Sequence, residues 1–134
     1  MDNYIEIQHV SLIVSDTKAA LAFYCDVLGM QEAARADLPY PGAWLQVGEQ
    51  QIHLLELPNP DPASMSERPE HGGRDRHTAI TVKDVSIVTQ QLEQAGITYT
   101  TSRSGRKALF FRDPDGNAIE LLEEADQFVI GAEK

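Results

Sequence analysis

Four polar residues are of the types, and at the spacing, that could bind one divalent metal ion. They are His9, His53, His77 and Glu120; His77 follows His9 by 68 residues (77 − 9 = 68), and Glu120 follows His53 by 67 (120 − 53 = 67). Imidazole nitrogens and carboxylate oxygens are donors that Zn, Ni, Co, Mn and Fe(II) accept, and two His with one carboxylate form a known open site. For any single histidine, an ordinary polar residue on a solvent-facing sheet is the simpler interpretation. The repeated spacing favours a metal site.

This spacing belongs to an internal repeat that covers most of the chain. Three blocks pair at offsets of 67 or 68 residues (77 − 9 = 68, 95 − 28 = 67, 119 − 52 = 67): residues 9–16 with 77–84, residues 28–30 with 95–97, and residues 52–56 with 119–123. Self-similarity at a fixed period indicates that one structural unit occurs twice.

The first copy has the pattern of a βαβββ unit. Residues 6–15 alternate between apolar and polar positions, which is typical of a half-buried strand. Asp16 or Thr17 would begin a helix, and Gly29 would end it. The remaining pattern predicts three further strands, at about residues 31–37, 43–48 and 51–57.

The second copy repeats this plan. It predicts a strand over residues 77–83 and a helix over 85–95 that ends at Gly96. The Asp-Pro-Asp-Gly-Asn sequence at residues 113–117 indicates a hairpin turn, because proline presets a negative φ and Asp-Gly tolerates a positive one. The strands predicted around these features lie at about residues 97–102, 107–112 and 117–123.

The length of 134 residues fits a single α+β domain that spans residues 1–134. We expect repeat 1 at about residues 5–57, a linker at 58–76, repeat 2 at about 77–123 and a C-terminal tail at 124–134. The linker is rich in proline, glycine and charge, so it could be an exposed connector or a lid over the site.

The composition argues against several classes of partner. A net charge of −10 would repel phosphate backbones and anionic lipids, so we expect no nucleic-acid and no membrane binding. No apolar run reaches the roughly 18 residues of a spanning helix, and the first residues lack the pattern of a signal peptide, so a cytoplasmic protein is expected. The lone Cys25 lies in a helical pattern, where a small buried residue is the favoured interpretation over a nucleophile.

Strand alternation predicts where the four donors point. The apolar Val10, Leu12 and Val14 are expected to face the helix, so His9 faces the other way. His77 follows the same rule in the second copy, and the apolar neighbours of His53 and Glu120 likewise turn these two side chains away from the helices. Two equivalent sheets packed edge to edge would bring the four side chains around one cavity.

Motifs along the chain resemble the vicinal oxygen chelate superfamily, which includes glyoxalase I, bleomycin resistance proteins and extradiol dioxygenases. The resemblance rests on HVSL at residues 9–12, FYCDVLGM at 23–30, HTAITV at 77–82 and FRDPDGNAIE at 111–120. It implies two βαβββ repeats that form an open, eight-stranded, barrel-like cavity around a metal ion, often in a homodimer. It also implies ligands on the first and last strands of each unit, at His9, His53, His77 and Glu120.

The resemblance suggests three kinds of function on a small-molecule substrate. The first is a metal-dependent lyase or isomerase of glyoxalase type, with a metal-stabilised enediolate and Glu120 as the base. The second is a dioxygenase or thiol transferase that uses two His and one Glu, with His53 beside the ligands. The third is a non-catalytic drug-binding resistance protein, which the four donors argue against. Glyoxalase I carries Glu where this chain has His53, and Glu56 cannot replace that Glu because alternation turns it to the opposite face.

Several further residues are weaker candidates for substrate contacts. Trp44 and Tyr40 could supply aromatic walls, although buried packing is the favoured interpretation. A basic cluster around Gly105 could bind a carboxylate or phosphate, and a solvated turn is an equally good interpretation; its members are Arg103, Arg106 and Lys107.

Overall fold

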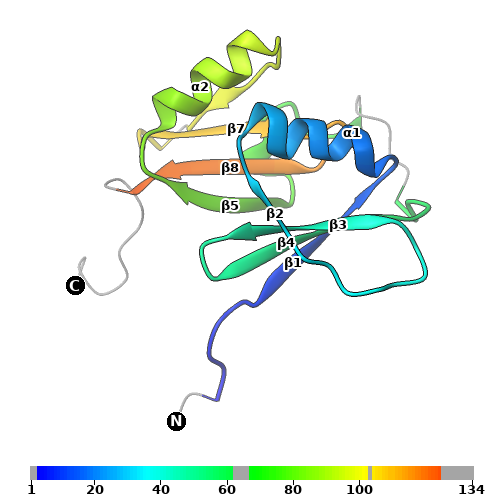
Figure 1. Cartoon of the computed structure of the whole chain (residues 1–134). Helices are drawn as coiled ribbons and strands as arrows, with labels where there is room; N and C mark the ends of the chain where they lie inside the picture. The colour runs from blue at the N-terminus through cyan, green and yellow to red at the C-terminus, as the bar shows by residue number, and fades with distance from the viewer. Residues whose placement is uncertain (1–2, 62–66, 103, 125–134) are drawn as a thin grey trace. The chain divides into compact units, whose positions relative to one another are not determined.

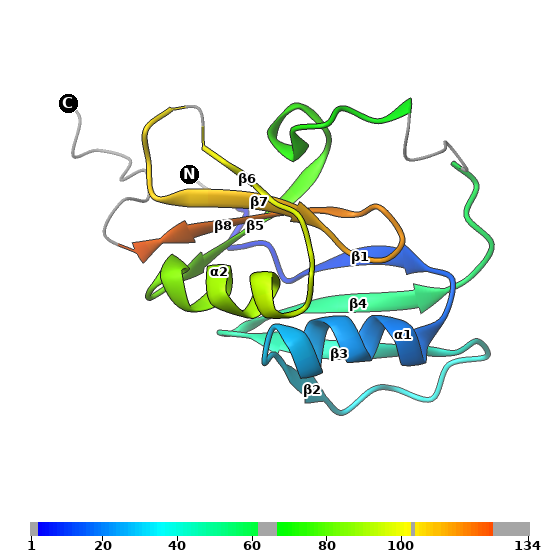
Figure 2. The same cartoon turned by 90° about the horizontal axis from the view of Figure 1, so that it is seen from above.

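The computed structural model describes residues 3–61, 67–102 and 104–124. The chain divides into two compact units, Met1–Pro62 and Ala63–Lys134. Each unit contains one four-stranded mixed sheet, and its helix lies along one face of that sheet (Figures 1 and 2).

Unit 1 has the predicted βαβββ order. β1 (His9–Val14) is followed by α1 (Thr17–Leu21), which continues as a π-helical segment (Ala22–Val27), and then by β2 (Gln31–Ala33), β3 (Gly42–Val47) and β4 (Gln50–Glu56). The strands lie in the order β1-β4-β3-β2, and β1 runs parallel to β4.

Unit 2 repeats the same topology. Its elements are β5 (His77–Val82), α2 (Val85–Gln94), β6 (Thr100–Thr101), β7 (Ala108–Arg112) and β8 (Ala118–Glu123), in the sheet order β5-β8-β7-β6 with β5 parallel to β8. This equivalence confirms the α+β fold of two βαβββ repeats.

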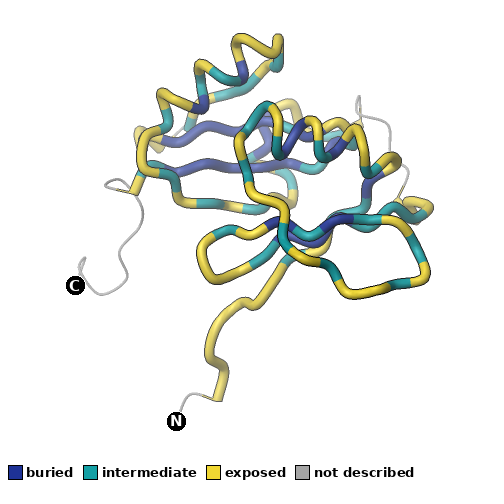
Figure 3. Tube along the Cα trace, in the orientation of Figure 1, coloured by how far each residue is buried: buried dark blue, intermediate teal, exposed yellow. Residues whose placement is uncertain are grey.

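The apolar faces also lie where the alternation predicts. Figure 3 shows the buried stretches along the central strands of both sheets, while the residues before β1 are exposed. In unit 1 the fully buried side chains include Val14, Leu45 and Leu54, and in unit 2 they include Leu92 and Ile119. The opposite face of each sheet is thereby left to the polar side chains.

Each helix begins with the same two acceptors. Asp16 caps α1 and Asp84 caps α2 with side-chain hydrogen bonds to backbone N–H groups, so Asp16, and not Thr17, is the cap. A glutamate at the end of the last strand adds a second acceptor: Glu56 Oε1 accepts from the Thr17 N–H at 2.7 Å, and Glu123 Oε1 accepts from the Val85 N–H at 3.2 Å. Glu56 therefore faces the helix, as predicted. No helix in the described residues is long and apolar enough to cross a membrane.

Some predicted elements are shorter or more structured than expected. The strands expected at 31–37 and 97–102 are limited to Gln31–Ala33 and Thr100–Thr101. The predicted linker 58–76 is not an exposed connector throughout, because its last part contains a 3₁₀ turn at Gly72–Arg74 and has His71 buried. Residues 62–66 and the tail from residue 125 lie outside the described residues.

Replacing Glu56 with alanine should destabilise the protein by about 1–2 kcal/mol, because a charge-assisted hydrogen bond to the first turn of α1 is lost. Urea unfolding measures this change. Glu49→Ala, in the exposed turn between β3 and β4, is the matched control and should stay within about 0.5 kcal/mol of the wild type. Equal unfolding midpoints for the two variants would contradict the assigned role.

Candidate metal and substrate site

His77 and Glu120 come together on the polar face of the unit 2 sheet. Glu120 of β8 lies opposite Ala79 of β5, so His77, two residues earlier on β5, shares its face. The His77 Nε2 atom lies 3.1 Å from Glu120 Oε1. Glu120 is only 4% exposed, which makes a positive partner necessary for its charge.

The donor atoms of this pair suit a divalent ion. Two ligands that each lie about 2.0–2.1 Å from one ion, at tetrahedral or octahedral angles, are roughly 2.8–3.4 Å apart. The 3.1 Å separation between His77 Nε2 and Glu120 Oε1 falls in that range. A nitrogen and a carboxylate oxygen are also the chemistry that zinc and its neighbours accept. This half of the predicted ligand set therefore fits a metal ion.

Two residues of the basic cluster around Gly105 lie on opposite faces of the unit 2 sheet. Arg106 Nη2 lies 3.5 Å from Glu120 Oε2, so this guanidinium is beside the candidate site. Lys107 Nζ instead lies 3.6 Å from Glu123 Oε2, at the helix-capping end of β8. Arg103 lies outside the described residues. Within the described part of the cluster, Arg106 alone reaches the candidate ligand.

The unit 1 pair is built from stacked rings. The His53 ring lies between those of His9 and Trp44, with centroid distances of 4.0 Å on both sides and interplanar angles of 18° and 6°. His53 Nε2 is 2.8 Å from Gln51 Oε1, and the Gln51 amide nitrogen donates to Gln46 Oε1. The Gln51 oxygen therefore accepts from His53, so ligation of a metal by Nε2 would require this hydrogen bond to be replaced.

Electrostatics keep His53 neutral. Burial lowers the pKa of His53 below its ordinary value, and the neighbouring His9 and Arg35 lower it further. A neutral imidazole has a free lone pair on one ring nitrogen, which is the form that binds metals.

Cys25 is not activated as a nucleophile. Burial raises the pKa of its thiol, and the neighbouring Glu32 and Asp26 raise it further. A raised pKa disfavours the reactive thiolate.

The two aromatic candidates have different surroundings. Trp44 does not pack in the helix-facing core, since it lies opposite His53 in the sheet and stacks on its ring. The Tyr40 ring lies under the Arg35 guanidinium at 5.3 Å, and Arg35 Nη2 also donates to the Tyr40 carbonyl. Trp44 is thus a wall beside the histidine pair, while Tyr40 anchors Arg35.

Some residues of the site were not predicted. Phe110 lies opposite Glu120 as Trp44 lies opposite His53, and its ring meets His77 edge-on at 5.5 Å. His71 packs on Phe110 at 4.6 Å, and its Nδ1 is 2.7 Å from Thr100 Oγ1. Phe110 follows Trp44 by 66 residues (110 − 44 = 66), one less than the offset of the last strands, so the sheet register and not the sequence offset identifies it. No signal in the sequence brings His71 to this sheet.

The segment before β5, residues 68–76, is held in place by the carboxylate of Asp75. Asp75 forms ion pairs with Arg112 at 2.9 Å and with Arg68 at 3.1 Å. Burial alone would raise the pKa of Asp75, but hydrogen bonds from Arg112, the Arg76 N–H and Arg68 outweigh it and hold the pKa below its ordinary value. Asp75 is therefore ionised at neutral pH.

The four predicted donors are present as two pairs, one in each unit. Across the described residues, no three His, Cys, Asp or Glu side chains are grouped so that they could hold a metal ion. That both pairs bind one ion stays a prediction.

These features agree with the comparison to known families. The model of the Glyoxalase/Bleomycin resistance protein/Dioxygenase superfamily matches residues 6–121. The chain belongs to this superfamily.

Individual relatives differ in what they do. Glyoxylase I 4 of Arabidopsis thaliana is 31% identical, over 86% of this chain and 68% of the relative. The glutathione transferase FosA of Serratia marcescens is 32% identical, over 86% of this chain and 78% of the relative. Among solved structures, the lactoylglutathione lyase of Agrobacterium tumefaciens has a TM-score of 0.64 and is 27% identical, over 90% of this chain and 94% of that one.

The stacking of Trp44 on His53 gives a test of the unit 1 geometry in the metal-free protein. Trp44 is the chain's only tryptophan, and a protonated imidazole in contact quenches indole fluorescence. We expect the emission to fall on acidification with a midpoint below 6.5, because the lowered pKa delays protonation of His53.

Arg35→Gln should move this midpoint upward, since it removes a positive charge that opposes protonation. His53→Gln should abolish the transition. A midpoint above 6.5, or an unchanged transition in His53→Gln, would show that the stack is not as described.

Proposed function

We propose that this chain is a metal-dependent enzyme of glyoxalase type, a lyase or isomerase that moves a proton between adjacent carbons of a small substrate. The observation that carries the proposal is the His77–Glu120 pair, with its 3.1 Å donor separation on the polar sheet face. Superfamily membership supports it, as do relatives named as glyoxalase and lactoylglutathione lyase.

The proposed ligands are His77 and Glu120 from unit 2 together with His9 and His53 from unit 1. The two pairs occupy equivalent positions of the repeat, on adjacent strands of each sheet. They could belong to one chain or to two copies in a homodimer. When bound, a divalent ion supplies Lewis-acid stabilisation of the negative charge that develops on two adjacent substrate oxygens.

Glu120 is the group that we assign to proton transfer. Its carboxylate takes a proton from one substrate carbon and returns it to the neighbouring carbon, while the hydroxyl proton passes from the oxygen of the first carbon to that of the second, so that the carbonyl and hydroxyl groups exchange places. Its Oε2 faces Arg106. This guanidinium, whose side chain is 39% exposed, can in turn bind an anionic group of the substrate. Trp44 offers an apolar wall beside the histidine pair.

His53 makes thiol transfer the second candidate. Glyoxalase I has Glu at the matching position, whereas a two-His, one-Glu set serves thiol transfer and dioxygenation in the superfamily. The hydrogen bond from His53 Nε2 to Gln51 fits a residue beside the metal as well as a ligand. The 32% identity to the glutathione transferase FosA supports addition of a thiol to a small electrophile.

Metal content should depend on the unit 2 pair. In protein purified without an affinity tag, His77→Ala and Glu120→Gln should each lower the bound metal at least about 10-fold, because a ligand is lost. Elemental analysis of the dialysed protein measures this loss.

Glu123→Gln is the matched control. It lies on the same strand as Glu120 but faces the helix, so it should retain the metal of the wild type. Wild-type protein without metal, or equal metal in all three variants, would remove the proposed site.

Activity distinguishes the two candidate reactions. The metal-loaded enzyme should isomerise the glutathione hemithioacetal of methylglyoxal, and Glu120→Gln should lower kcat/KM by about 10²–10⁴ because the base is lost. Thiol-dependent consumption of fosfomycin without isomerase activity would favour thiol transfer. Oxygen uptake with Fe(II) and a catechol would instead indicate dioxygenation, and a rate no better than that of free metal in every assay would contradict an enzyme of this type.

A further inference from the structure

The orientation of His77 depends on one backbone carbonyl. His77 Nδ1 lies 2.8 Å from the carbonyl oxygen of Asp75. A carbonyl only accepts hydrogen bonds, so Nδ1 must carry a proton and donate it. Nε2 is then the ring nitrogen left for another partner, and it faces Glu120 Oε1.

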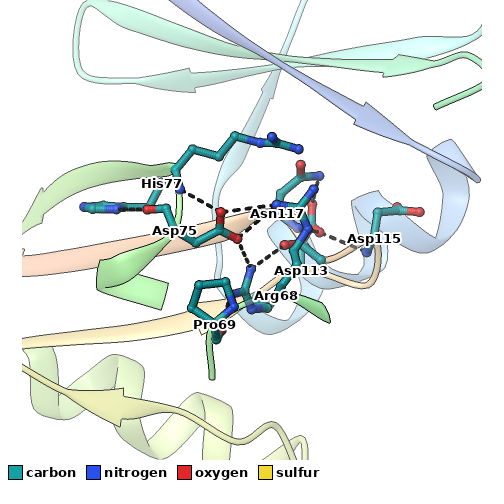
Figure 4. A network of polar contacts seen from close by, with 10 residues as sticks. Arg68, Pro69, Asp75, His77, Asp113, Asp115 and Asn117 are labelled. Carbon is teal, nitrogen blue, oxygen red and sulfur yellow. Dashed lines mark hydrogen bonds and ion pairs between the residues drawn. The ribbon is translucent and has the colours of Figure 1, made fainter. Parts of the chain in front are cut away.

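The Asp75 side chain holds this carbonyl in place. Figure 4 shows Asp75 between His77 and Arg68, with the carboxylate directed to the Arg68 guanidinium. Arg112 Nη1 donates to the second oxygen at 2.9 Å, and the Arg76 N–H donates to the first at 2.8 Å. The side chains of all three ion-pair partners are no more than 13% exposed, so these charge-assisted bonds are little weakened by water.

Arg112 ties the segment to the sheet that carries His77. Arg112 of β7 and His77 of β5 both lie opposite Ala118 of β8, so the three residues share a face. Arg112 also donates to the carbonyls of Gly116 and Pro69, at 2.9 and 2.6 Å. One guanidinium thus links the β7–β8 turn to both ends of the segment before β5.

Two small residues allow the segment to lie on the sheet. A Cβ atom added to Gly72 would be 3.3 Å from the Ala118 Cβ, and one added to Gly73 would be 2.8 Å from His71 Nε2. Larger side chains here would press on Ala118 of β8 and on the rings of His71 and Phe110.

The equivalent positions of unit 1 lack this arrangement. The counterpart of Asp75 is Ile7 (75 − 68 = 7), which is 77% exposed. The counterpart of Arg112 is Gln46, which lies opposite Gln51 as His9 does. His9 Nδ1 instead contacts the side chain of its neighbour Gln8, and not a backbone carbonyl two residues before it. The feature therefore does not follow from the repeated fold itself.

We infer that Asp75, fixed by Arg68 and Arg112, is a positioning residue that keeps His77 in the tautomer and orientation in which Nε2 faces Glu120. This inference rests on the proposed metal site and deepens it, because it makes the unit 2 pair the pre-organised half of the ligand set. Hydrogen-bond partners that orient a metal ligand in this way usually contribute about 10- to 100-fold to metal affinity.

A merely structural role for the same ion pairs would affect stability alone. If Asp75 positions His77, then Asp75 also determines which ring nitrogen of His77 binds the metal. The direct readout is the scalar coupling between ¹¹³Cd and the ring nitrogens of ¹⁵N-histidine-labelled protein. In the wild type, cadmium should couple to His77 Nε2.

The test compares Asp75→Asn, Arg112→Ala and Arg112→Lys by zinc competition with a chromophoric chelator and by the cadmium coupling. Asp75→Asn and Arg112→Ala should raise the Kd for zinc about 10- to 100-fold and weaken or split the coupling to His77 Nε2. Arg112→Lys keeps the charge but replaces the two-nitrogen planar fork with a single nitrogen, so it should be intermediate. Arg74→Ala, exposed on the same segment, should match the wild type.

The outcomes separate this inference from the proposed function. Wild-type protein in which cadmium couples to no nitrogen of His77 would overturn both. Coupling to His77 Nε2 in the wild type, with unchanged zinc Kd and coupling in folded Asp75→Asn and Arg112→Ala, would overturn the positioning role alone. Should Arg112→Ala fail to fold by circular dichroism, Asp75→Asn and Arg68→Ala decide the same question.

Discussion

Parallel pairing of the first and last strands in each unit is the constraint on which the candidate site depends. Ser11 lies opposite His53, and Ala79 lies opposite Glu120. A donor two residues earlier on the first strand then shares a face with the donor on the last strand, because side chains alternate with period two. A slip of one residue would turn a donor toward the helix. The same register places Glu56 and Glu123 at the starts of the helices, so helix docking and donor placement depend on one pairing.

The two units satisfy their polar groups differently. Unit 2 buries a carboxylate, and a buried carboxylate is stable only with positive or hydrogen-bonding partners. Arg106 supplies such a partner for Glu120, and His77 Nε2 lies 3.1 Å from the same carboxylate. The ion pairs of Asp75 fix the position of His77. Unit 1 buries a neutral imidazole between two flat rings, which needs much less charge compensation. The repeat thus places a pair of polar side chains at the same strand positions in both units. Charged neighbours hold the pair in unit 2, whereas stacked rings hold the pair in unit 1.

Much of this arrangement could be predicted from the sequence because it follows local rules. Alternation placed Glu56 on the helix side and His77 and Glu120 on the other, and the 67-residue offset of IHLLE and IELLE (119 − 52 = 67) predicted the equivalent strands. The predicted lengths of β2 and β6 were too great. The strand-like pattern covers residues 31–37 and 97–102, but only Gln31–Ala33 and Thr100–Thr101 form strands. The packing of residues 68–76 was missed because it depends on Arg112, which is 37 residues from Asp75 in the sequence, and on the small side chains that let the segment lie on the sheet. Proline, glycine and charge in a segment indicate a loop but do not say what the loop packs against.

The central claim is that equivalent strand positions of both units donate to one ion. Zinc K-edge X-ray absorption of the zinc-loaded protein tests it most directly, because multiple scattering counts the imidazoles bound to the metal. We predict a first shell of nitrogen and oxygen with three imidazoles, or two where His53 lies beside the metal, and a single imidazole in a His9→Ala and His53→Ala double variant. Sulfur in the first shell, or an imidazole count that is the same in wild type and double variant, would contradict it.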